Sequence, residues 1–218
     1  MRSRYLTNGI RGMQPHEMLE ILMYHAIPRA DTNPLGHALL DRFGSVSGVL
    51  SASPQELAQV PGMTENAVTM LMYLRDLYCY AEADRLRGCP LDSFAGCCEL
   101  FARLYQFESR RLVRAVFLDD RLRLISSEIL LSGGIGELAE LPVTAIASRA
   151  AAAGSQTVII SHNHRTMPAK PSKEDIAVTR HLVPKLRQQG IQLIDHIIIG
   201  VHDALSLREA GVFMGLEE

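Results

Sequence analysis

Residues 157–164 read TVIISHNH, an apolar run that ends in two histidines separated by one residue. A short run rich in β-branched residues is typical of a buried strand. Side chains two residues apart in a strand face the same side, so His162 and His164 present two imidazoles to one point. That arrangement suits a metal ion that accepts nitrogen ligands, zinc first. Because chance alone places about 0.3 such pairs in a chain with this histidine content, other residues must support the site.

The segments around this run alternate between two patterns. Strand-like runs cover residues 113–118, 122–131, 157–161 and 191–200. Helix-like segments cover residues 94–105, 142–153 and 172–189. This alternation predicts an α/β (α+β) domain over residues 95–218, with a mixed sheet flanked by helices.

The first part of the chain has a different pattern, with apolar residues at helical spacing. Helices are predicted over residues 16–24, 35–43, 54–59 and 64–84. Gly44 is a predicted C-terminal cap, and Ser53 before Pro54 is a predicted N-terminal cap. Residues 87–92 have the composition of a linker. We therefore predict a separate helical domain over residues 1–86.

Residues 171–175 read PSKED and begin the helix that follows the two histidines. Ser172 and Asp175 have the S-x-x-D spacing of a capping box, which satisfies backbone N–H groups at a helix start. The functional alternative makes Asp175 a third metal ligand and Ser172 a hydrogen-bond donor to water or to an oxyanion. Both interpretations can hold together.

Glu128 lies inside the strand-like run of residues 122–131. Strict alternation places it on one face with Leu122, Leu124 and Leu130. A carboxylate in that company is costly unless it has a partner. One interpretation is an edge strand with Glu128 turned to solvent; the other is a general base whose pKa is set by burial and a nearby metal.

These residues form a coherent chemical set. Two histidines and an aspartate leave the fourth position of a zinc ion open for water. Glu128 would take the proton of that water and pass it to a leaving amine, and Ser172 would help to hold the developing oxyanion.

The spacing H-x-H, seven residues, Ser, two residues, Asp matches the JAMM (MPN+) metalloprotease motif, with Glu128 as its upstream carboxylate. Along nearly its whole length the chain resembles the bacterial RadC family. The segments that carry the resemblance are RFGS (42–45), SPQEL (53–57), VPG (60–62), SHNH (161–164), PSKED (171–175) and DHIIIG (195–200).

The resemblance implies a helical N-terminal part with a helix-hairpin-helix-like turn, followed by an MPN domain. It implies one zinc ion held by His162, His164 and Asp175. It also implies that Glu128 is the acid/base of a hydrolase that cleaves a peptide or isopeptide bond, so that a protein or peptide is the substrate.

Three segments depart from the family pattern. The residues after His164 are Arg165-Thr166-Met167 instead of Pro-Ser-Gly, so we expect a different loop over the metal. The usual Pro-Arg-Glu reads Pro142-Val143-Thr144, which removes a basic group. The hairpin turn reads Gly62-Met63-Thr64, without the second glycine that lets a phosphate approach the backbone.

Composition and charge narrow the class of protein. The chain has 218 residues, of which 47% are hydrophobic and 21% charged, and its formal net charge is −2. These values are typical of a folded globular protein and argue against an obviously basic nucleic-acid protein. We expect no membrane span, no secretory signal, reduced cysteines and a cytoplasmic location.

The alternative hypothesis is a DNA-associated protein, either a metal-dependent nuclease or a binding module linked to DNA repair. Residues 1–85 hold seven Arg, no Lys and nine Asp or Glu, which gives a formal charge of 7 − 9 = −2 and disfavours DNA binding there. Residues 162–188 hold six basic residues against Glu174 and Asp175, a balance that would steer an anionic substrate or partner.

Overall fold

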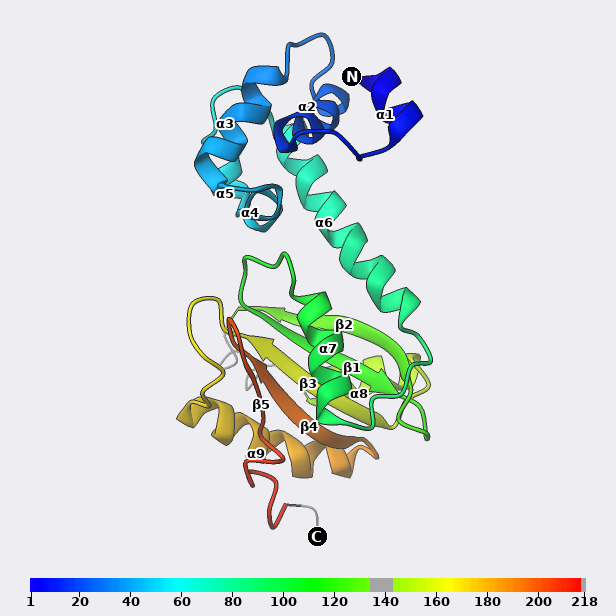
Figure 1. Cartoon of the computed structure of the whole chain (residues 1–218). Helices are drawn as coiled ribbons and strands as arrows, with labels where there is room; N and C mark the ends of the chain where they lie inside the picture. The colour runs from blue at the N-terminus through cyan, green and yellow to red at the C-terminus, as the bar shows by residue number, and fades with distance from the viewer. Residues whose placement is uncertain (134–142, 217–218) are drawn as a thin grey trace. The chain divides into compact units, whose positions relative to one another are not determined.

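The computed structural model describes residues 1–133 and 143–216. The chain divides into two compact units, Met1–Tyr78 and Cys79–Glu218. The first unit is helical (Figure 1). Its helices are α1 (Arg2–Asn8), α2 (Pro15–Ala26), α3 (Asn33–Phe43), α4 (Val46–Ser51), α5 (Pro54–Ala58) and the beginning of α6 (Glu65–Arg85).

The helix ends in the first unit follow local capping chemistry. Gly44 ends α3 with a φ of 77°, the left-handed conformation that glycine adopts without a steric cost. The Ser53 side chain accepts a hydrogen bond from the backbone N–H of Glu56, and Pro54 occupies the first turn of α5. Both predicted caps are therefore confirmed. Apolar residues from α2 to α6 form the core of this unit, centred on Met23, Leu39 and Val49.

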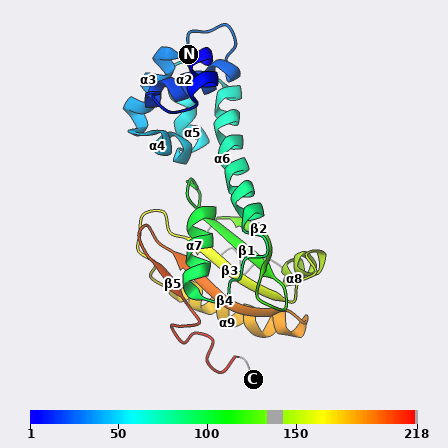
Figure 2. The same ribbon diagram turned by 45° about the vertical axis from the view of Figure 1, so that its right-hand side comes forward.

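The second unit is a mixed sheet with helices on both faces (Figures 1 and 2). Its strands are β1 (Leu112–Leu118), β2 (Leu124–Ser132), β3 (Thr157–Asn163), β4 (Gln192–Ile199) and β5 (Ala204–Ser206). Its helices include α7 (Phe94–Leu104), α8 (Val143–Ala152) and α9 (Lys173–Gln188). The strand order is β2-β1-β3-β4-β5, and the pair β3–β4 is parallel while the other pairs are antiparallel. The predicted α/β (α+β) class is confirmed.

Each face of the sheet has its own apolar core. Phe101 and Leu104 of α7 pack with Val116 and Ile159 on one face. The other face packs against α8 and α9, whose contributions include Ile146 of α8. Because side chains alternate along a strand, β1 supplies residues to both cores and is buried along its whole length.

β2 departs from the strict alternation that the sequence predicts. A register shift next to Leu118 pairs Leu124 with Leu118, whereas Glu128 is paired with Ala115. Leu118 packs in the core beneath α7, and Ala115 packs in the core on the opposite face. The prediction that Leu124 and Glu128 share a face is therefore wrong, because one extra residue in a bulged strand reverses the side-chain direction beyond it.

Smaller differences concern the ends of elements. Leu122 lies before β2 in a turn, with a φ of 56°, and is not part of the strand. The sequence patterns missed α1, α4 and β5, which are short. Pro142, the predicted start of a helix, lies outside the described residues. Within the described ranges, no helix combines the length and apolar character needed to cross a bilayer.

Candidate metal centre

The end of β3 brings the two histidines together. His162 is paired with Val113 of β1 and Ile198 of β4, and it is buried. His164 follows the strand, and its backbone N–H donates a hydrogen bond to the carbonyl of Ile199 at 2.7 Å. The two side chains converge, with the Nε2 atoms 3.2 Å apart.

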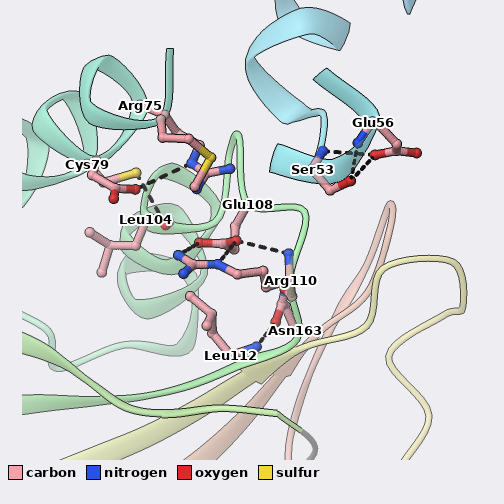
Figure 3. A network of polar contacts seen from close by, with 11 residues as sticks. Ser53, Glu56, Arg75, Cys79, Leu104, Glu108, Arg110, Leu112 and Asn163 are labelled. Atoms are coloured by element: carbon pink, nitrogen blue, oxygen red, sulfur yellow. Dashed lines mark hydrogen bonds and ion pairs between the residues drawn. The ribbon is translucent and has the colours of Figure 1, made fainter. Parts of the chain in front are cut away.

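Asn163, between them, fixes the neighbouring strand, and Figure 3 shows it beside Leu112 and Arg110. Its Oδ1 accepts a hydrogen bond from the backbone N–H of Leu112 at 2.8 Å, and its Nδ2 donates to the carbonyl of Arg110 at 3.0 Å. Asn163 thus holds the residues on both sides of Arg111 against the strand that carries His162.

The start of α9 supplies the carboxylate. The Ser172 Oγ accepts a hydrogen bond from the backbone N–H of Asp175 at 3.1 Å, and the backbone N–H of Ser172 donates to Asp175 Oδ2 at 2.6 Å. This is a complete capping box, as the spacing predicts. Asp175 is 1% exposed, yet its Oδ1 has no hydrogen-bond partner among the described residues. The cap therefore uses one carboxylate oxygen and leaves the other free.

The free oxygen faces the histidines. Asp175 Oδ1 lies 3.4 Å from His162 Nε2, and the ligand atoms of His162, His164 and Asp175 all lie within 4.8 Å of one another. Ligands about 2.05 Å from a tetrahedral zinc ion are separated by about 3.3 Å, close to the two short distances here. No second group of this kind occurs in residues 1–133 and 143–216. The three residues fit a metal ion.

A chain of hydrogen bonds determines which nitrogen of His162 carries the proton. The carbonyl of Asp175 can only accept, so the Thr179 hydroxyl donates to it at 2.7 Å. The Thr179 oxygen then accepts from His196 Nδ1–H at 2.7 Å. His196 Nε2 keeps a lone pair and accepts from His162 Nδ1–H at 3.0 Å. The lone pair of His162 Nε2 is therefore left for a metal ion.

His164 is oriented in the same manner by a backbone carbonyl. Its Nδ1–H donates to the carbonyl of Pro168 at 2.9 Å, which leaves the Nε2 lone pair free. Metal-binding histidines commonly donate their second N–H to a carbonyl or carboxylate group, which fixes the ring.

Burial keeps the two inner histidines neutral. It is the main cause that lowers the pKa of His162 to about 4; the Asp175 carboxylate opposes it, and the charges of His164 and Arg111 lower it further. Burial also lowers the pKa of His196 well below its usual value. Both rings are therefore uncharged at neutral pH, as a metal-binding imidazole must be.

The three ligand atoms open into a pocket of about 310 Å³. It is lined by Arg111, Gly133, His162, Asn163, His164, Met167, Lys170, Ser172, Glu174 and Asp175. The unusual loop after His164 therefore contributes Met167 to the wall and leaves the pocket open.

That loop is anchored by the turn between β4 and β5. The backbone N–H of Ala169 donates to Asp203 Oδ1 at 2.8 Å, and the N–H of Val201 donates to the carbonyl of Met167 at 3.3 Å. Gly200 permits this close approach, because a Cβ there would collide with the backbone nitrogen of Ala169.

Glu128 is not among the residues that line the pocket. It faces the same side of the sheet as His162, because its partner Ala115 is two residues from Val113, the partner of His162. The backbone of Glu128 is separated from that of His162 by two strand spacings, about 10 Å across the sheet, and by about 7 Å along the strands. The side chain is 42% exposed and its Oε2 lies 3.8 Å from Arg149 Nε.

Two functional candidates escaped sequence reasoning. His196 is buried and hydrogen-bonded, and its partner is His162, a candidate metal ligand. Glu174 lines the pocket beside Asp175. His196 can be connected with the site only when β4 is known to pair in parallel with β3, because this pairing places His196 beside Ile160.

A mixed sheet with helices on both faces, a His-x-His pair at a strand end and an aspartate in the first turn of the next helix define a JAMM-like, metal-dependent JAB domain. Comparison with known proteins narrows this class. Residues 91–212, more than half of the chain, match the family model described as "RadC-like JAB domain". The chain belongs to the RadC family.

Similar proteins extend this relationship over the N-terminal unit. A UPF0758 protein of Burkholderia thailandensis is 31% identical over 211 residues, which cover 96% of this chain and 80% of that protein. A UPF0758 protein of Rhodobacter capsulatus is 31% identical over 213 residues, which cover 97% of this chain and 99% of that protein. The similarity therefore includes both units.

Proposed function

We propose that this protein is a zinc-dependent hydrolase that cleaves a peptide or isopeptide bond. The observation that carries the proposal is the buried Asp175 Oδ1, which has no hydrogen-bond partner among the described residues and faces two imidazole nitrogens whose lone pairs are free. An orphaned carboxylate oxygen in a buried position is costly, and a bound cation removes that cost.

The donor set favours zinc. Two imidazole nitrogens and one carboxylate oxygen are typical zinc ligands, and three protein ligands leave one tetrahedral position open, as in catalytic sites. Zinc, when bound, supplies a Lewis acid that polarises a carbonyl group and acidifies water.

The side chains around the cluster supply the remaining chemistry. Glu128 accepts a proton from the attacking water and delivers it to the leaving nitrogen. Among the described residues, its carboxylate has one ion pair, a long one with Arg149. This weak contact allows the side chain to turn towards the pocket. Ser172 Oγ accepts from Asp175 N–H, which leaves its own O–H to donate to an oxyanion, a contribution of about 3 kcal/mol.

We expect hydrolysis that depends on zinc. Peptides and lysine-linked isopeptides carrying a fluorophore and a quencher are incubated with the full chain, before and after chelation and zinc restoration. Cleavage should disappear on chelation, return with zinc and be absent in His162→Ala. The matched control is His181→Ala, an exposed histidine of α9 that does not line the pocket.

Two outcomes would contradict the proposal. One is peptide cleavage that survives chelation and the His162→Ala change. The other is zinc-dependent cleavage of labelled DNA in the absence of any peptide cleavage, which favours the nuclease hypothesis instead.

A further inference from the structure

The pocket beside the metal cluster has two positively charged side chains without a partner among the described residues. Arg111 and Lys170 line the pocket and are exposed. Among residues 1–133 and 143–216, neither side chain forms a hydrogen bond or an ion pair. By contrast, the adjacent Arg110 is paired with Glu108 at 2.8 Å (Figure 3).

Hydrogen bonds of neighbouring residues fix the backbone on which Arg111 and Lys170 lie. Arg111 lies between the two residues that Asn163 binds, next to the strand end that carries His162. Lys170 lies between Ala169, which is bonded to Asp203, and the cap of α9. The backbone positions of Arg111 and Lys170 therefore follow from the same elements that position the metal ligands.

The charge balance of the pocket favours an anion. Zinc with two neutral histidines and the Asp175 carboxylate carries a formal charge of +1. Arg111 and Lys170 add two positive charges, and Glu174 is the one other carboxylate among the described residues that line the pocket. A group entering this pocket meets a net positive electrostatic potential. The low-dielectric walls of a pocket focus such a field.

The size and lining of the pocket favour a peptide. Its volume of about 310 Å³ suits a short segment of chain, at the small end of the range for ligand sites. Met167, 49% exposed, offers an apolar wall for a neighbouring side chain. Nucleic-acid binding instead depends on a track of several phosphate contacts, and two cations beside a carboxylate do not form one.

We propose that the substrate is a peptide segment with a carboxylate next to the bond that is cut, and that Arg111 and Lys170 bind this carboxylate. The inference rests on the proposed function. Arg111 offers the planar fork that binds a carboxylate through two hydrogen bonds, and Lys170 adds a point charge. The carboxylate comes from an Asp or Glu side chain or from a free C-terminus.

The test measures binding separately from cleavage. Zinc-loaded full-length Glu128→Gln protein is titrated into fluorescein-labelled octapeptides that differ at one central position, Glu, Gln or Lys, each with an amidated and a free C-terminus. Fluorescence anisotropy gives the dissociation constants. The same titrations are made with Arg111→Gln and Lys170→Gln added. The matched control is Lys185→Gln, an exposed lysine of α9 that lies outside the pocket lining.

The Glu peptide should bind about 10-fold more tightly than the Gln peptide. Arg111→Gln or Lys170→Gln should each weaken the binding of the Glu peptide by about 3- to 10-fold. Lys185→Gln should change little. If the carboxylate is a chain end, the free-acid peptides bind more tightly than the amides whatever the central residue.

Several results would overturn the proposal. These are equal binding of acidic and neutral peptides, no measurable binding of any peptide, equal losses in all three charge variants, or a labelled DNA 20-mer that binds more tightly and depends on Arg111 and Lys170. Wild-type hydrolysis separates the two proposals. Acidic peptides that bind selectively but are never cut contradict the hydrolase and leave carboxylate recognition standing, whereas equal cleavage of neutral peptides does the reverse.

Discussion

Replacing Glu128 by glutamine is expected to lower the rate of peptide hydrolysis by about 10²- to 10⁴-fold, the usual contribution of general acid–base catalysis. Glutamine has the same shape but accepts no proton. The zinc content should not change, because Glu128 lies outside the three-ligand cluster. The measurement is kcat with a cleaved peptide, beside the metal content of the same samples.

The matched control is Glu174→Gln, because Glu174 lines the pocket beside the candidate ligand Asp175. We expect this change to have a much smaller effect on kcat. If Glu174→Gln abolishes hydrolysis while Glu128→Gln leaves it intact, the base is the pocket carboxylate and the role given to Glu128 is wrong.

Removing the acceptor behind His162 is expected to weaken zinc binding by about 10- to 100-fold, the usual effect of losing a partner that orients a metal ligand. His196→Leu leaves His162 Nδ1–H without its acceptor, and Thr179→Val removes the other end of the chain. His196→Gln, whose amide both accepts and donates, should retain part of the affinity. Competition with a chromophoric chelator gives the zinc affinity.

A readout beyond affinity separates positioning from general stability. In the metal-free wild-type protein, ¹⁵N chemical shifts should show the proton of His162 on Nδ1, and in His196→Leu they should show a mixture of tautomers. Unchanged zinc affinity and an unchanged tautomer in His196→Leu would contradict the hydrogen-bond chain.

The metal cluster was accessible to sequence reasoning because its signals are local. The alternation of a strand places His162 and His164 on one side, and the S-x-x-D spacing of a cap places Asp175 at the start of a helix. The structure adds that the cap itself orients Asp175, since the backbone of Ser172 uses only one of its two oxygens. The α/β class likewise follows from patterns within single elements.

Features that depend on strand order or irregularity were not accessible. The face of Glu128 relative to Leu124 was predicted wrongly because a bulge, which leaves no clear mark in composition, reverses the alternation. The role of His196 depends on β4 lying parallel beside β3, and the approach of Arg111 to His162 depends on β1 lying on the other side of β3. The periodicity of apolar residues in the sequence does not indicate such long-range strand pairings.

The metal content of the purified protein shows whether His162, His164 and Asp175 bind zinc. Purified protein, supplied with zinc and then desalted, is measured by mass spectrometry beside His162→Ala and His164→Ala, the second being the less buried change. We expect about one zinc ion per wild-type chain and the loss of that ion in both variants. A folded wild-type protein that retains no zinc, or variants that retain as much as the wild type, would contradict this expectation.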